Sequence, residues 1–200
     1  MRPTSDFAQA KAYTNGESPA KFPAGGYVCR IISARESAFP NSNDPCLQIA
    51  LEIAEGEYAG VIREQFDRKR QFNANAKWPA ILMQGTVEKG TNNTNPYFKG
   101  LIAAIQDSNI GYSWNWEEKT LINKLVGVVF RDEQYYNKDG ELQSTVRPFY
   151  ACSTAQIKLG VATPKPRPPR TQPPAQASMA AASAMGMPAE YEDEELPPWA

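Results

Sequence analysis

The feature that most restricts the fold is a strict alternation over residues 46–55. The side chains on one side of this segment are all large and apolar, namely Leu47, Ile49, Leu51 and Ile53. Polar or small side chains occupy the positions between them. A period of two is the repeat of a β-strand whose two faces meet different surroundings. The chain is therefore predicted to contain a sheet with one buried face.

Four further strands are predicted from apolar and aromatic content between turn-forming residues. They cover residues 27–38, 61–72, 125–136 and 141–152. The alternation in the first is imperfect, so a β-bulge is expected there. The last two strands are joined by Asn137-Lys138-Asp139-Gly140, which is a hairpin signal.

One helix is predicted to follow Asn95, which suits the N-cap, with Pro96 at the first helical position. Four apolar residues then recur at helical spacing, and Gly111 marks the stop. These are Phe98, Leu101, Ile102 and Ile105. A second, short helix is predicted over residues 80–83.

The predicted order of three strands, one helix and two strands indicates a mainly β fold. It is the element order of the OB-fold, a five-stranded Greek-key barrel whose strand 2–3 face and adjacent loops bind oligonucleotides or sugars. A β-sandwich or another small barrel has the same order of elements. The domain is predicted to span residues 22–161, after an N-terminal arm of residues 1–21.

The chain has 200 residues and no histidine, so it lacks the commonest general base and the commonest metal ligand. Its three cysteines, Cys29, Cys46 and Cys152, are widely spaced, which is unlike a zinc ribbon and typical of buried thiols in a reducing cytoplasm. The neighbouring carboxylates Asp132 and Glu133 belong to no nuclease motif. We therefore expect a non-catalytic protein that needs no metal and no cofactor.

The composition changes after residue 161. Residues 162–189 are rich in proline and alanine, which predicts a disordered linker, and residues 190–200 form an acidic tail with an apolar tip. Residues 161–200 carry three basic and five acidic side chains, which leaves 18 basic and 17 acidic ones in residues 1–160. Any nucleic-acid site must therefore be a local patch. Without a signal peptide or an apolar run of about 20 residues, the protein is expected to be cytoplasmic, with no membrane contact.

The tail resembles those of bacterial and phage single-stranded-DNA-binding proteins, which pair an acidic run with a short apolar tip. The similar residues are Glu192, Asp193, Glu194, Glu195, Leu196, Pro197, Pro198 and Trp199. The Gly25-Gly26-Tyr27 opening, the strand at residues 47–53 and the strand from Leu125 are similar to phage-encoded members of the OB-fold type.

This resemblance implies sequence-tolerant binding of single-stranded DNA in phage DNA replication, recombination or repair, inside an infected bacterium. It also implies that the eight tail residues recruit partner proteins and that the acidic run competes with DNA for the binding groove. An acidic tail can also be a solvating segment alone.

Single-stranded DNA binding requires cations for the phosphates and aromatic faces on which bases stack. Residues 61–72 and the last hairpin combine both types. The candidates are Arg63, Phe66, Arg68, Lys69, Arg70, Phe72, Arg131, Tyr135, Tyr136, Lys138, Arg147 and Tyr150. Phe66 and Phe149 also fit core positions. Trp78, Trp114 and Trp116 are interpreted as core or edge residues, although a tryptophan in a loop across the groove would suit DNA binding.

A rival hypothesis is a protein-binding adaptor or assembly protein that makes no direct contact with DNA. The near-neutral charge of residues 1–160 favours it. Self-association into a homo-oligomer is left open under both hypotheses.

Overall fold

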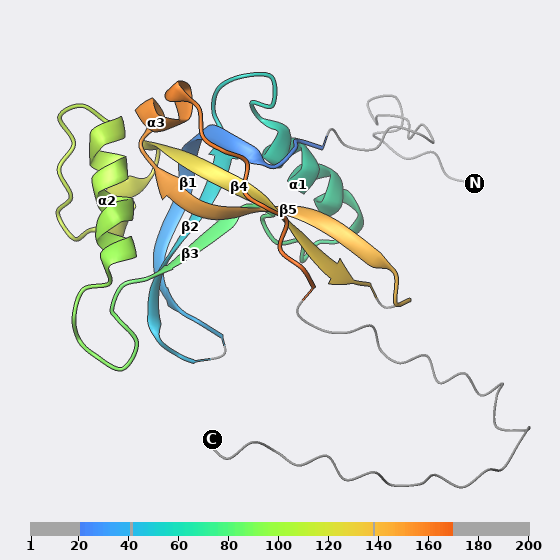
Figure 1. Ribbon diagram of the computed structural model, residues 1–200, viewed down its shortest axis with the longest axis horizontal. Coiled ribbons are helices and arrows are strands. Elements are labelled where there is room, and N and C mark those ends of the chain that lie inside the picture. Colours follow the sequence, from blue (N-terminus) through green and yellow to red (C-terminus); the bar gives the residue numbers. More distant parts are fainter. Residues whose placement is uncertain (1–20, 41, 138, 170–200) are drawn as a thin grey trace, which may run out of the picture.

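The computed structural model describes residues 21–40, 42–137 and 139–169. Figure 1 shows how its strands and helices are arranged. The strands are β1 (Gly25–Ala38), β2 (Pro45–Ile53), β3 (Ile81–Gly85), β4 (Leu125–Tyr136) and β5 (Leu142–Cys152). The helices are α1 (Val61–Phe72), α2 (Pro96–Ser108), the 3-10 helix η1 (Glu118–Leu121) and α3 (Thr154–Leu159).

All neighbouring strands pair antiparallel in one open sheet of order β3-β2-β1-β4-β5. This confirms the predicted mainly β fold with five strands, and α2 is the predicted helix between the third and fourth strands. The first, second, fourth and fifth predicted strands match β1, β2, β4 and β5 to within two residues at each end.

β1 is the strand on which the sheet is assembled, because it is hydrogen-bonded along both edges. Residues 25–30 pair with residues 125–130 of β4, and residues 29–38 pair with β2. The register with β2 shifts between Ile31 and Ser33, which confirms the predicted bulge. The core lies on the face that the alternation in β2 predicts, since all four of its alternating apolar side chains are buried.

The third predicted strand, residues 61–72, is wrong: this segment is α1. Ile62 and Phe66 are four residues apart, which fits a helix as well as a strand. Only Val61 and Ile62 are buried, and most of the remaining residues are arginine, lysine, glutamate and glutamine, which are good helix formers.

The third strand of the sheet is instead β3, which includes most of the segment predicted as a short helix. Its residues 81–85 pair with residues 46–50 of β2. A short apolar run has too few residues to distinguish a strand from a helix by periodicity. Here, pairing with the exposed edge of β2 decides the conformation.

The predicted start and apolar face of α2 are confirmed, whereas the predicted stop at Gly111 is not, because Asn109 is the C-cap. The Asn95 side chain accepts a hydrogen bond from the backbone N–H of Tyr97 at 2.9 Å, Pro96 opens the helix, and all four predicted apolar residues are buried. The helix ends at Ser108, and the Asn109 amide exchanges hydrogen bonds of 2.7 and 3.0 Å with the backbone of Leu125. These bonds attach the end of α2 to the start of β4.

α3 packs on the sheet at two glycines, Gly26 of β1 and Gly127 of β4. A Cβ atom on Gly127 would lie 2.6 Å from both Ile157 Cγ1 and the Ser153 carbonyl oxygen. A capping box formed by Ser153 and Gln156 fixes the start of α3. Because a backbone atom is among these contacts, the helix approaches β4 too closely for any side chain at residue 127.

The first prediction concerns this contact. Gly127→Ala should destabilise the protein by about 1–3 kcal/mol, the usual result of overpacking. Gly100→Ala is the matched control, because a Cβ at this position in α2 meets nothing within 4 Å. It should stabilise by about 0.5–1 kcal/mol, since alanine is the better helix former. Chemical denaturation measures both, and equal effects of the two substitutions would contradict the packing described.

Candidate nucleic-acid interface

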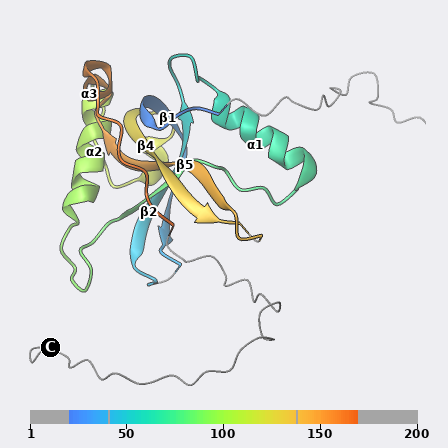
Figure 2. The same cartoon turned by 45° about the vertical axis from the view of Figure 1, so that its right-hand side comes forward.

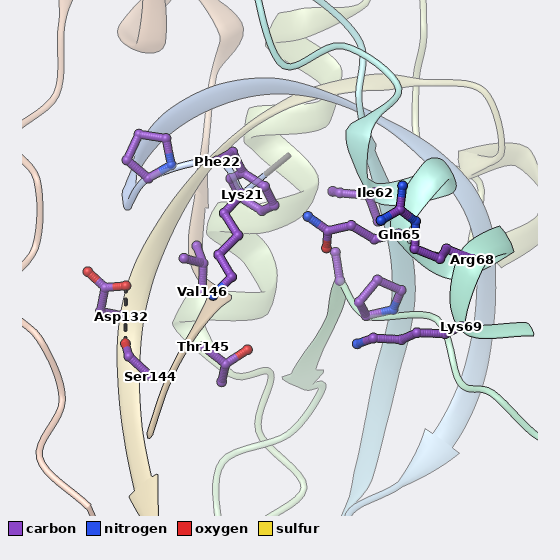
Figure 3. A pocket seen from close by; sticks show the side chains of 13 residues that line it. Lys21, Phe22, Ile62, Gln65, Arg68, Lys69, Asp132, Ser144, Thr145 and Val146 are labelled. Atoms are coloured by element: carbon purple, nitrogen blue, oxygen red, sulfur yellow. Dashed lines mark hydrogen bonds between the residues drawn. The ribbon is translucent and has the colours of Figure 1, made fainter. Parts of the chain in front are cut away.

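A cleft of about 420 Å³ separates α1 from the β4–β5 hairpin. Figures 1 and 2 place α1 and the hairpin tip on one side of the molecule and α2 and α3 on the other. Figure 3 shows Gln65, Arg68 and Lys69 along the α1 wall, with Lys21 and Phe22 between the walls. The hairpin wall is made by Asp132, Ser144, Thr145 and Val146.

The cleft combines a cationic margin with an apolar interior. Lys21 and Lys69 extend into it from different parts of the chain, whereas Arg68 lies along the helix (Figure 3). Phe22, Pro79 and Val146 contribute apolar surface. Among the described residues that line it, the one carboxylate is that of Asp132, which accepts a hydrogen bond from the Ser144 hydroxyl at 3.4 Å.

Two predicted residues, Arg68 and Lys69, therefore do line one cleft, although on a helix and not on a strand. Lys21 and Phe22 were missed as site residues because they sit at the boundary between the predicted arm and domain. Their signal is a cation beside an aromatic residue directly before the first strand. Phe22 is buried, in edge-to-face contact with Phe130 at 5.1 Å between ring centres.

α1 is fixed to the sheet by the Glu52 carboxylate of β2. It accepts hydrogen bonds from the backbone N–H groups of Ile62 at 3.2 Å, Arg63 at 2.7 Å and Ile53 at 3.0 Å. Two of these donors belong to the first turn of the helix, which otherwise lacks acceptors. Burial raises the pKa of Glu52, and the three N–H groups offset part of that rise.

Arg63 and Phe66 lie against Trp78 rather than with Lys69. The Arg63 guanidinium is 5.6 Å from the Trp78 ring centre, and the Phe66 ring centre is 4.9 Å from it. The Trp78 indole N–H donates to the Leu51 carbonyl at 2.8 Å, which fixes the ring to β2. Phe66 is thus partly buried in an aromatic contact at the edge of the core.

Beside this aromatic contact, a hollow of about 410 Å³ lies on the outer face of the sheet. Arg35 reaches into it from β1 and donates two hydrogen bonds to Gln48 of β2, at 3.0 and 3.2 Å. Arg35 and Gln48 were not predicted as site residues, and Trp78 was interpreted mainly as a core or edge residue. Gln48 could have been found as a site residue from its position on the polar face of β2.

Phe72 ends α1 and has 78% of its surface exposed, as befits the predicted stacking residue but not a core residue. With Lys69 it borders a shallow hollow at the helix end. Arg70, in the same last turn, is also exposed. The exposed end of α1 thus continues the cationic side of the cleft.

The predicted hairpin residues divide between the two faces of β4 and β5. Arg131, Tyr135 and Arg147 lie on the face opposite the cleft. Arg131 precedes the cleft residue Asp132 in β4 and therefore points the other way, and Arg147 is its partner in β5. Tyr136 is half-buried, Tyr135 is exposed, and Tyr150 borders a separate groove beside α2. Lys138 and the eight tail residues predicted to bind partners lie outside the described residues.

The remaining aromatic and sulfur-containing residues separate into core and surface. Trp78 and Trp114 pack against the core, but Trp116 is 74% exposed. Cys29 and Cys46 are buried and Cys152 is partly buried, which agrees with the predicted thiols. Burial raises the pKa of each of these thiols and so keeps them protonated and unreactive at neutral pH.

No cluster of three or more side chains suited to a metal ion occurs within the part of the chain that the structure describes. Nor does any helix among residues 21–40, 42–137 and 139–169 combine the length and apolar character needed to cross a membrane. No protein-family model matches the sequence, and no curated protein matches it significantly.

The second prediction tests how α1 is held. Glu52→Ala should remove three hydrogen bonds and cost about 1 kcal/mol, the usual effect of losing a helix cap. Amide hydrogen exchange at Ile62 and Arg63 should accelerate more than in the sheet. Glu64→Ala, which removes an exposed carboxylate from the same helix, is the control. Unchanged protection in Glu52→Ala would show that the carboxylate is not what fixes the helix.

Proposed function

We propose that the protein binds single-stranded DNA without catalysis and with little sequence preference, along the cleft between α1 and the β4–β5 hairpin. The observation that carries the proposal is the cleft itself. Cationic side chains from the chain segment before β1 and from α1 converge on it around an apolar interior. Phosphates would contact the lysines, and a base would be received by the apolar surface.

The order of the strands supports an OB-fold-like, partly open barrel. β1 pairs with both β2 and β4, and the two edge strands, β3 and β5, approach each other. An OB-fold of this kind binds oligonucleotides across strands 2 and 3 and the adjacent loops. The hollow with Arg35, Gln48, Arg63 and Trp78 occupies that face, so it offers a second stretch of the same DNA path.

The proposed biological setting is phage DNA replication, recombination or repair, in the cytoplasm of the host. In this setting the acidic tail, Glu192 to Trp199, recruits partner proteins and competes with DNA for the cleft. The support is its sequence, in which four carboxylates precede an apolar tip that contains a tryptophan.

The third prediction tests DNA binding through Lys69. Anisotropy of a labelled oligo-dT, titrated at several salt concentrations, should show binding that weakens steeply with salt, with little binding to duplex DNA. Lys69→Ala should weaken binding and reduce the slope of log affinity against log salt by about one. Lys99→Ala, an exposed lysine on α2 on the other side of the molecule, should change neither.

Absence of single-strand binding at low salt, with or without the tail, would reject the proposal. The adaptor hypothesis would then be tested by capturing partners on the tail. If Lys69→Ala and Lys99→Ala lose equal affinity, the proposal that the protein binds DNA would stand, but its assignment to the cleft would be contradicted.

The fourth prediction concerns the tail. Removing residues 190–200 deletes five acidic side chains and should tighten binding of oligo-dT most strongly at low salt, where charge interactions are least screened. A variant with these five residues changed to glutamine or asparagine should bind as tightly as the truncated protein. If the truncated and the full-length protein bind oligo-dT equally tightly at every salt concentration, competition by the tail is contradicted.

A further inference from the structure

We propose that Arg131, Arg147 and Arg167 form a phosphate-binding subsite for the DNA backbone, and that Glu133 occupies this subsite in the free protein. The inference rests on the proposed binding of single-stranded DNA. It adds a second contact region, on the face of the hairpin opposite the cleft, and a residue that opposes binding there.

Three arginines surround the single carboxylate of Glu133. Its Oε1 atom lies 3.5 Å from Arg131 Nη2 and 3.3 Å from Arg167 Nη1, and its Oε2 atom lies 3.8 Å from Arg147 Nε. The four side chains carry a net charge of +2. They border or adjoin a surface hollow of about 410 Å³ that also includes the exposed Tyr135.

The strand register places these charges together. Arg131 and Arg147 are directly opposite each other in the β4–β5 ladder, and Glu133 follows Arg131 on the same face. Like charges at opposed positions repel, so an anion beside the pair stabilises it. Glu133 provides that anion within the same strand.

The third arginine comes from the predicted linker. The Arg167 N–H donates to the Asp132 carbonyl at 2.8 Å, and the Gln134 N–H donates to the Arg167 carbonyl at 3.0 Å. These bonds form a parallel bridge to β4 beyond the residues that pair with β1. The backbone of the linker thus fixes the Arg167 side chain beside Glu133.

The arginines offer more donors than the carboxylate uses. Arg131 Nε is buried and has no acceptor, while its guanidinium stacks over the Phe149 ring at 3.9 Å. The three Arg–Glu133 distances, 3.3 to 3.8 Å, are long for charge-assisted hydrogen bonds. A DNA phosphodiester carries the same single negative charge as Glu133 on two non-bridging oxygen atoms and is not held by the strand backbone, so it can exchange with the carboxylate and approach the arginine donors more closely.

Neighbouring groups suit a nucleotide and not only a free anion. Tyr135 lies next to Glu133 on the same face, with 48% of its surface exposed, and offers a ring on which a base can stack. Thr145 borders both this hollow and the cleft, so the two regions meet at the hairpin. We therefore assign the subsite to a phosphate within a DNA strand.

The fifth prediction uses Glu133→Gln, which removes the charge but preserves the size of the side chain. Loss of the internal competitor should tighten binding of oligo-dT by about threefold or more at low salt and make the salt dependence steeper. Glu117→Gln makes the same charge change on an exposed residue next to η1 and should have no such effect. An oligonucleotide with neutral methylphosphonate linkages should show no gain from Glu133→Gln.

Arg167→Gln provides a second test if Glu133→Gln does not fold. It leaves the Arg131 and Arg147 contacts with Glu133 and should weaken oligo-dT binding and lower the salt slope. Normal DNA binding by the unaltered protein, with Glu133→Gln equal to Glu117→Gln and Arg167→Gln unchanged, would overturn the subsite alone. Failure of the unaltered protein to bind DNA would instead reject the proposed function. Tighter binding of inorganic phosphate by Glu133→Gln, without tighter DNA binding, would show a free-anion site and overturn the assignment to DNA.

Discussion

The arrangement of both candidate surfaces depends on where β1 pairs with β4. The ladder between them ends at Gly25 and Phe130, so β4 continues for six residues without a neighbour from β1. This extension, paired with β5, forms the hairpin wall of the cleft. Its unpaired edge is also where the Arg167 backbone binds. A longer β1 would cover that edge and displace Lys21 and Phe22 from the cleft.

The opposite wall depends on a partly buried polar contact. Placing Glu52 at the sheet surface under α1 costs solvation energy, as the raised pKa of its carboxyl group reflects. The three backbone N–H groups that it accepts recover part of this cost, and they exist because helix starts leave donors unpaired. The result is a helix held at its first turn. Its cationic side chains can therefore face the hairpin from a fixed position, although only Val61 and Ile62 of the helix are buried.

The sequence predicted elements whose signals were local. The alternation in β2, the Asn95-Pro96 start of α2 and the Asn137-Gly140 turn each act through neighbouring residues, and each was confirmed. α1 was predicted as a strand because the spacing of Ile62 and Phe66 fits both the helical and the strand period. β3 was predicted as a helix because residues 80–83 are too few to show any period. The partners that decide between these conformations, Glu52 for α1 and the edge of β2 for β3, are distant in sequence.

The sequence could not show which candidate residues share a surface, because residue type does not specify a face. Arg68 and Lys69 meet Lys21 in the cleft, whereas Arg131 and Arg147 lie on the other side of the hairpin and Tyr150 beside α2. The Arg131–Arg147 pair also bears on the near-neutral charge of the domain. Two opposed cations in a ladder repel each other whether or not DNA is present, so Glu133 stabilises the pair in the free protein. A low net charge is then compatible with nucleic-acid binding, since one internal anion can be replaced by one phosphate without any change in the charge of the site.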